Sequence, residues 1–347
     1  MVSVGIVGVG FMGMIHYLAY QRLRGVKVRA ICEQDPVRRG GDWRTIKGNF
    51  GPPGEQMDLS GVAQYADLDA MLADPELDLI DICLPTALHA PAAIKALAAG
   101  KHVLCEKPIA LKPADGIAMV DAADKAGRML MIGHVLPLYH EYRFAYEAIA
   151  SGTYGQIKGG HFKRIISDPL WMPRFYDPAV IGGPMLDLHV HDAHFIRLTC
   201  GMPQSVQCAG RMRGEVVERF HAQFRFDDPE LIVTAASGVI AQQGRPFTHG
   251  YEIYLEKATL LYDFAVIGGK PMLATPLTVL TDDGQVVHPE LCGGDAITPF
   301  ENELTEVVNA VQSGVPSPLL GGALARDAVV ICQKETEAVL TGETVRF

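Results

Sequence analysis

The sequence predicts two domains of different fold class, an α/β domain with a doubly wound parallel sheet and then an α+β domain with an antiparallel sheet. Apolar runs alternate with helical stretches as far as about residue 133, which is typical of a parallel sheet covered by helices. Beyond that point the apolar runs are turn-separated and partly alternating. At 347 residues the chain also exceeds the roughly 250–300 residues of a single core. We place the domains at 1–133 and 134–347.

The first 33 residues have the order of a dinucleotide-binding βαβ unit. An apolar run, Val2 to Val7, leads into the glycine-rich segment Gly8–Gly13 and a helix through about Leu23. A second apolar run, Val26 to Cys32, ends at an acid, Glu33. Strand, glycine-rich turn, helix, strand and terminal acid are the parts of the Rossmann fingerprint. An ordinary glycine turn with a solvated acid is the alternative.

Each part of this turn has a physical role. Gly8 permits the tight turn, Gly10 lets the backbone approach a pyrophosphate, and Gly13 lets the helix pack closely on the strand. Phe11 and Met12 begin the helix, whose free N–H groups and partial positive charge attract phosphates. We therefore expect all five residues to contact the cofactor.

The end of the second strand distinguishes NAD from NADP. The Glu33 carboxylate can accept hydrogen bonds from both ribose hydroxyls and repels a 2′-phosphate, so it favours NAD. Arg38 and Arg39 follow closely and can hold a phosphate, which leaves NADP as the alternative.

The later strands of the first domain place further candidates at their carboxyl ends, where ligands bind in doubly wound sheets. We expect strands over 78–84, 102–105 and 129–132, with helices over 67–72, 90–99 and 113–126 and a long loop over 36–66. The candidates are Pro85 and Thr86 near the cofactor ribose, Glu106 at the nicotinamide ribose, Lys107, and His134. His89, at the next helix start, is either a cofactor ligand or a capping residue.

In the second domain the sequence predicts several strands and four helices. The expected strands are 157–166, 204–210, 217–226, 231–239, 249–256, 259–263 and 277–281, and the helices are 141–150, 185–199, 299–313 and 323–340.

Composition excludes several classes of function. The net charge of −10 argues against a nucleic-acid partner. The sequence has no apolar run of about 18 residues and no basic, apolar leader, so neither a membrane span nor a signal peptide is expected. None of the seven cysteines forms a CxxC pair, which favours free thiols in a reducing compartment, the cytoplasm.

Three segments in order, GVGFMG, LPTALHAPAAIKALAAGKHVLCEKPIA and GGPMLDLHVHDAHFIRLTCG, resemble the Gfo/Idh/MocA family of oxidoreductases. The resemblance covers nearly the whole chain. It implies an N-terminal NAD(P) domain and a C-terminal α+β domain with a large, open, predominantly antiparallel sheet. It also implies a sugar, polyol or related cyclic alcohol as substrate, and assembly as a homodimer or homotetramer.

Three residues of this chain match motif positions that take part in catalysis in this family. Lys107 matches the lysine of the EKP motif, and Asp187 and His191 match the acid and histidine of the later helix. Oxidising a carbinol sends a hydride to nicotinamide and a proton to a base. We expect His191 as that base, because imidazole titrates near neutrality, and Lys107 as hydroxyl ligand and proton relay. The two roles can be exchanged, and the Lys107–Pro108 bond is expected to be cis.

The helix around these residues departs from the common family pattern. Asp187, His191 and His194 follow i, i+4, i+7 spacing and so share a face, while His189 replaces the usual glycine. A cluster of imidazoles can indicate a metal site. His189 and His191, however, point about 200° apart on a helix, so we expect no bound metal. The expectation is a polar substrate pocket.

Further pocket residues are expected outside that helix. Arg164 and Arg174 are candidate donors to hydroxyls or a carboxylate, and Trp171 is a candidate face for a sugar ring. A structural or surface role is the alternative for each of the three.

The sequence therefore predicts an NAD-dependent dehydrogenase of a sugar, polyol or cyclic alcohol. One alternative is a glycosidase that works by transient oxidation and elimination on bound NAD. A non-enzymatic NAD(P)-binding sensor is the other, although a sensor does not need Lys107, Asp187 and His191 together.

Overall fold

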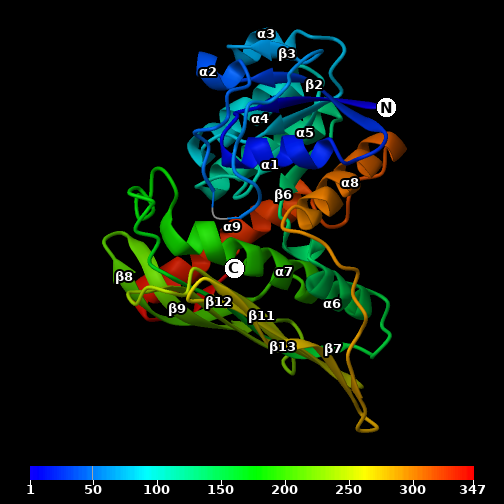
Figure 1. Ribbon diagram of the computed structural model, residues 1–347. Coiled ribbons are helices and arrows are strands. Elements are labelled where there is room, and N and C mark those ends of the chain that lie inside the picture. Colours follow the sequence, from blue (N-terminus) through cyan, green and yellow to red (C-terminus); the bar gives the residue numbers. More distant parts are fainter. Residues whose placement is uncertain (49) are drawn as a thin grey trace. The chain divides into compact units, whose positions relative to one another are not determined.

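The computed structural model describes residues 1–48 and 50–347, and the chain divides into two compact units (Figure 1). The first unit contains Met1–Leu138 and Gly293–Arg326. The second contains Tyr139–Cys292 and Asp327–Phe347. The chain thus returns to its first unit late in the sequence.

The first unit is built on a six-stranded parallel sheet, as predicted. Its strands are β1 (Val2–Val7), β2 (Val26–Cys32), β3 (Ala63–Tyr65), β4 (Leu79–Ile82), β5 (His102–Glu106) and β6 (Leu130–Gly133). They lie in the order β3-β2-β1-β4-β5-β6, with Val7 opposite Cys32 and Ile82 opposite Cys105. The strand order reverses between β1 and β4, which is where doubly wound sheets bind ligands.

The helices of this unit have identifiable ends. They are α1 (Phe11–Tyr20), α2 (Pro36–Arg39), α3 (Leu68–Leu72), α4 (His89–Ala98), α5 (Pro113–Ala126) and α8 (Thr298–Ser313), with short 3₁₀ turns at Thr86–Leu88 (η1) and Leu136–Leu138 (η2). Pro113 begins α5 at a position that needs no N–H donor, and Gly127 ends it in the left-handed conformation. The expected loop over 36–66 was partly wrong, because α2 and β3 lie inside it.

The second unit contains a nine-stranded, mostly antiparallel sheet. Its strands are β7 (Ile157–Ser167), β8 (Ser205–Arg213), β9 (Val216–Arg225), β10 (Ile232–Ile240), β11 (Phe247–Leu255), β12 (Ala258–Ile267), β13 (Lys270–Thr281), β14 (Val286–Val287) and β15 (Val345–Arg346). They lie in the order β14-β13-β12-β11-β7-β10-β9-β8-β15. Among the described strand pairs of this nine-stranded sheet, only β7 and β10 are parallel. The short strands β14 and β15 were not predicted.

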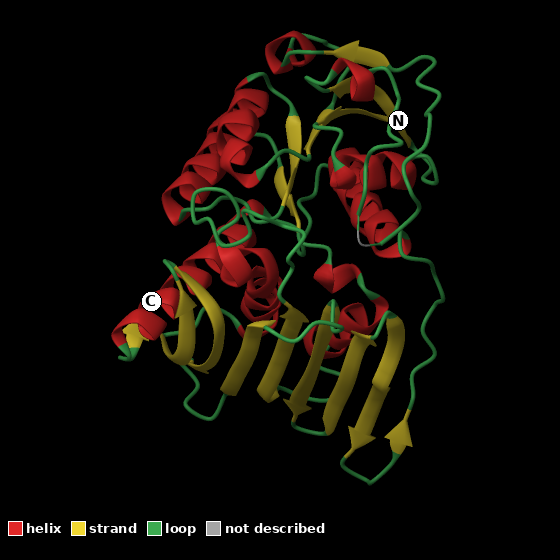
Figure 2. Ribbon diagram, turned by 60° about the vertical axis from the view of Figure 1, so that its left-hand side comes forward, coloured by secondary structure: helices red, strands yellow, loops and turns green. Residues whose placement is uncertain are grey.

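The helices of the second unit pack on one face of this sheet (Figure 2). They are α6 (His140–Ala150), a π-helical turn η3 (Met185–His189), α7 (Val190–Cys200) and most of α9 (Gly322–Thr341). The sequence predicted one regular helix over 185–199, but its first turn is π-helical. A π turn inside a longer helix commonly marks a functional segment.

The division into units differs from the predicted boundary between residues 133 and 134. The segment Gly293–Arg326 follows the second sheet in sequence, yet it packs with the first unit. Its helix α8 buries Phe300, Leu304 and Val307. The segment after α8 pairs with β6, since the Ile132 N–H donates to the Leu320 carbonyl at 2.8 Å. Apolar periodicity alone does not reveal which core a helix joins.

Two smaller expectations are confirmed. The Lys107–Pro108 peptide is cis. The seven cysteines are free thiols. Among the helices of the described residues, none combines the length and the apolar character that a bilayer crossing requires.

Candidate active site

The glycine-rich turn leaves room for a ligand where the fingerprint requires it. Gly8 has φ +90°, a conformation that other residues rarely adopt. A Cβ on Gly13 would lie 2.1 Å from the Gly8 carbonyl oxygen, so only glycine fits there. A Cβ on Gly10 would meet nothing within 4 Å among the described residues. The backbone at Gly10 is therefore open, as binding of a pyrophosphate requires. Phe11 and Met12 are half-buried in the first turn of α1.

Glu33 lies against this turn. Its Oε2 accepts a hydrogen bond from the Val9 N–H at 2.8 Å, and its Oε1 accepts one from the Asp35 N–H at 2.9 Å. The Arg39 guanidinium donates to the Glu33 carbonyl at 2.7 Å. The Arg38 Nε lies 3.8 Å from Asp35. The carboxylate therefore stands beside the glycine turn, and the two arginines are engaged with the same loop.

The ends of β4 and β5 carry the next candidates. Pro85 is exposed and Thr86 begins the short turn η1. Lys107 is half-buried and follows the buried Glu106 at the end of β5. The Glu106 Oε2 accepts a hydrogen bond from the Lys107 N–H at 3.1 Å. His134 follows β6 and is buried.

His89 has a different place from the one expected for a cofactor ligand. The ring is 1% exposed, with Nδ1 2.9 Å from the Pro108 carbonyl oxygen and Nε2 2.8 Å from that of Leu84. Burial lowers the pKa of His89, while the two carbonyls oppose this shift by favouring the protonated ring. Because both nitrogens face backbone, we assign His89 to packing of the strand-end loops instead of cofactor contact.

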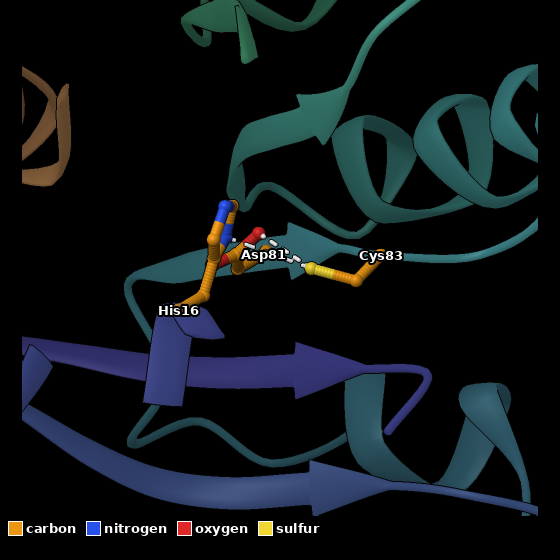
Figure 3. Close-up of side chains that lie close together, drawn as sticks. All are labelled: His16, Asp81 and Cys83. Atoms are coloured by element: carbon orange, nitrogen blue, oxygen red, sulfur yellow. Dashed lines mark hydrogen bonds and ion pairs between the residues drawn. The ribbon is translucent and has the colours of Figure 1, made fainter. Parts of the chain in front are cut away.

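A polar cluster that the sequence reasoning missed is formed by His16, Asp81 and Cys83 (Figure 3). His16 of α1 is fully buried, with Nδ1 2.9 Å from Asp81 Oδ2 and Nε2 3.1 Å from Glu106 Oε1. The Cys83 Sγ lies 3.6 Å from the His16 Nδ1 and 3.5 Å from Asp81 Oδ1. An acid within the apolar strand Leu79–Ile82 was the available signal.

These three side chains have the atoms of a metal site but are bound to one another. Histidine, carboxylate and thiol can ligate zinc. Here the His16 nitrogen and the Asp81 oxygen, at 2.9 Å, have a hydrogen-bond separation, and tetrahedral ligands about one zinc ion stand roughly 3.3 Å apart. Burial raises the pKa of the Cys83 thiol, and the Asp81 carboxylate adds to that shift. The cluster is therefore a charge network.

The second unit carries Asp187 and His191. Asp187 lies in the π turn η3, and His191 lies in the first turn of α7. Both side chains are half-buried. A four-residue separation keeps two side chains on one side of either kind of turn. The shared face with His194, which is buried, stays a prediction.

His189 is directed into the core of the second unit. Its Nε2 lies 2.9 Å from the Glu335 Oε2 of α9, and both side chains are fully buried. Burial would lower the pKa of His189, but Glu335 raises it, and burial raises the pKa of Glu335 itself. Both shifts favour a proton held between the two groups. This partner from α9 explains how the chain accommodates a histidine in place of a glycine.

Arg164 is also in the core, which corrects its expected contact with substrate. Its Nε and Nη2 donate to the Asp192 carboxylate at 2.7 and 3.1 Å, and both residues are almost fully buried. We assign it to holding α7 on β7. Trp171 is 68% exposed, as an aromatic face for a ligand would be. Arg174 is exposed and paired with Asp177 at 2.7 Å.

Breaking the Arg164–Asp192 pair should strongly destabilise the second unit. Arg164→Met leaves a buried carboxylate unpaired, at a cost of about 3–5 kcal/mol. The double variant with Asp192→Leu should recover most of that loss. Lys95→Met is the control, because Lys95 pairs with Asp69 at the surface, where loss costs at most about 1 kcal/mol. Urea unfolding measures all four proteins. Equal stability of the Arg164 and Lys95 variants would contradict the assignment.

Comparison with known proteins identifies both parts of the chain. Residues 2–134 match the model described as "Oxidoreductase family, NAD-binding Rossmann fold". Residues 142–261 match the model of the GFO/IDH/MocA C-terminal domain. Myo-inositol 2-dehydrogenase from Thermotoga maritima is 30% identical over 202 residues, which are 57% of this chain and 54% of the relative.

Other relatives have different activities. The 1,5-anhydro-D-fructose reductase of Ensifer adhaerens is 31% identical over 62% of this chain and 63% of the relative. The 2,7-anhydro-N-acetylneuraminate hydratase of Escherichia coli is 30% identical over 47% of this chain and 40% of the relative. The chain spans less than half the length of the first three curated relatives that it matches.

Solved structures share the fold over the full length. Levoglucosan dehydrogenase in complex with NADH and levoglucosan has a TM-score of 0.78 and 20% identity, covering 99% of both chains. An oxidoreductase from Agrobacterium radiobacter in complex with NAD⁺, L-tartaric acid and magnesium has a TM-score of 0.79 and 18% identity, covering 99% of this chain and 98% of that one.

Proposed function

The chain belongs to the GFO/IDH/MocA oxidoreductase family, and on that premise we propose that it is an NAD-dependent dehydrogenase of a sugar, polyol or related cyclic alcohol. The observation that carries the proposal is the position of Lys107. It follows β5 in the parallel sheet whose β1 ends in the open glycine turn. Carboxyl ends of parallel strands share one edge of the sheet, so this lysine and the cofactor turn belong to one edge.

The first unit has the parts needed to hold NAD. We propose that the backbone at Gly10 and the N-terminus of α1 hold the pyrophosphate, and that Glu33 accepts hydrogen bonds from the ribose hydroxyls. The preference for NAD over NADP follows from the negative charge of Glu33 beside the turn. When bound, the nicotinamide supplies the acceptor for a hydride.

The chain's own residues handle the proton and the substrate oxygen. We propose that His191 removes the hydroxyl proton, since imidazole has an ordinary pKa close to neutrality. The Lys107 ammonium binds the same oxygen and stabilises its developing negative charge. Asp187 accepts a substrate hydroxyl and orients the imidazole. Trp171 offers its exposed ring to a sugar face.

Substrate screening with both cofactors tests the proposal. Sugars, inositols and glycosides are incubated with NAD and, in parallel, with NADP. The fluorescence of the reduced nicotinamide and the release of aglycone are both recorded. We expect net NADH formation with a sugar or polyol and NAD. Aglycone release without net NADH would establish the second candidate instead, and inactivity of a folded, NAD-binding protein across the panel would contradict both.

That second candidate, a glycosidase that acts by transient oxidation and elimination, is favoured by one observation. The hydratase among the relatives has a name that describes no net oxidation. In this reaction the same lysine and histidine would handle protons, and the cofactor would return to its starting state. A non-enzymatic sensor gains no support from the presence of Lys107, Asp187 and His191.

A further inference from the structure

A fully buried histidine of α1 connects the dinucleotide-binding helix to the strand that ends at Lys107. His16 comes three residues after Gly13 and faces the sheet, with 0% exposure. One ring nitrogen lies 2.9 Å from the Asp81 carboxylate on β4, and the other lies 3.1 Å from the Glu106 carboxylate on β5. Nδ1 is hydrogen-bonded to Asp81, while Nε2 lies within ion-pair distance of Glu106 without the alignment of a hydrogen bond. A carboxylate beside each ring nitrogen favours the cationic, doubly protonated ring.

The charges around the ring support this protonation state. Burial would lower the pKa of His16, but Asp81 and Cys83 raise it well above its usual value. Burial would raise the pKa of Glu106, yet His16 and Lys107 hold it below its usual value. The other titratable groups facing the cluster are Tyr20 of α1, His89 of α4, Cys105 of β5 and Glu303 of α8. Burial raises the pKa of Tyr20, Cys105 and Glu303 and lowers that of His89, so burial favours the neutral form of each.

The Glu106 carboxylate contacts both the His16 ring and the backbone of Lys107. Its Oε1 lies near the His16 ring, while its Oε2 accepts the hydrogen bond from the Lys107 N–H at 3.1 Å. On the other side, the His89 ring contacts the Pro108 carbonyl at 2.9 Å. Lys107 is thus flanked by two residues that are each held by a buried histidine.

We propose that His16 is a positioning residue of the proposed dehydrogenase: as a buried imidazolium it fixes the Glu106 carboxylate and, through it, the backbone at Lys107. The inference rests on the proposed function for its effect on turnover. The protonation state of the ring does not depend on that function. This restraint keeps the backbone at Lys107 in one conformation. Misplacement of a catalytic group by about 1 Å costs on the order of 100-fold in rate.

Two measurements test the proposal, beginning with the protein without cofactor. Imidazole ¹⁵N spectra of the wild-type chain should show a doubly protonated ring at pH 8 whose signal disappears in His16→Gln. Asp81→Asn provides a second assignment if His16→Gln does not fold, because losing the counter-charge should move that ring's titration to lower pH. A neutral ring at His16 at pH 7 would overturn the proposal even if no substrate had been found.

Turnover provides the second measurement. In His16→Gln, kcat should fall roughly 10- to 100-fold, while NAD affinity and KM stay within about 3-fold. The Glu106 pKa, no longer held down by the imidazolium, should rise, and the ¹³C titration of the Glu106 carboxyl in the folded protein measures that rise. A role in packing alone would lower stability without moving this titration.

His102→Gln is the matched control. His102 lies at the opposite end of β5, where its ring accepts one hydrogen bond from the Met129 N–H at 3.1 Å. Its removal should leave kcat and the Glu106 titration unchanged. Unchanged kcat and an unmoved Glu106 titration in His16→Gln would overturn the proposal. Inactivity of the wild type, together with a doubly protonated His16 ring, would refute the proposed function and leave the protonation state of the cluster established.

Discussion

Replacing Lys107 with methionine should abolish turnover while leaving dinucleotide binding intact. Methionine keeps most of the length of the side chain and removes the ammonium, so the substrate oxygen loses the charge that stabilises its alkoxide character. Loss of such a group costs at least about 100- to 1,000-fold in kcat. Because the glycine turn and Glu33 hold NAD in our proposal, its affinity should change little. Progress curves of NADH fluorescence and titration of protein fluorescence with NADH measure the two effects.

A nearby lysine provides the control for this substitution. Lys112 is exposed at the N-cap of α5 and makes no side-chain capping hydrogen bond, so Lys112→Met should behave as the wild type. Turnover within about tenfold of wild type in Lys107→Met would refute its role at the substrate oxygen. Loss of NADH binding in that variant would show that Lys107 binds the cofactor and not the substrate.

Two glycines of the cofactor turn, Gly13 and Gly10, should respond to alanine in opposite ways. Gly13→Ala places a methyl group 2.1 Å from the Gly8 carbonyl oxygen, so helix and turn must separate. Such overpacking costs about 3 kcal/mol or more. The Tm of the first unit should fall by roughly 5 °C or more. Calorimetry of the protein without cofactor measures this loss.

Gly10→Ala should leave stability unchanged and impair binding instead. Gly10 has φ −90° and ψ −160°, which alanine adopts without strain, and no described atom would lie within 4 Å of its Cβ. The added methyl group would occupy the space through which a pyrophosphate approaches the backbone, so NAD affinity should fall by at least about tenfold. Equal NAD affinity in Gly10→Ala and the wild type would contradict the proposed cofactor site, whatever the result for Gly13→Ala.

Much of the first unit could be read from its sequence because its signals are local. The strand, glycine turn, helix and acid from Val2 to Glu33 lie within one βαβ unit, and the strand ends gather at one edge by topology alone. Glu33 accordingly lies against Val9. The EKP motif likewise identified the cis Lys107–Pro108 peptide through a family resemblance.

The pairing of buried charged residues could not be predicted from the sequence. Arg164 and Asp192 are 28 residues apart, and His189 and Glu335 are separated by almost half of the chain. A charged residue in a sequence looks the same whether it faces a ligand or a counter-charge in the core. For this reason the sequence left both a ligand contact and a structural role open for Arg164 and for His89.

The sequence by itself determined the two fold classes, the cofactor turn and the candidates at the strand ends, because periodicity and glycine placement act over a few residues. Only the tertiary structure decided that α8 belongs to the first unit, that the helix carrying Asp187 begins with a π turn, and that His16 stands between Asp81 and Glu106. Those outcomes depend on which distant segments share a core. Desolvation there makes each buried charge depend on a partner that local sequence does not specify.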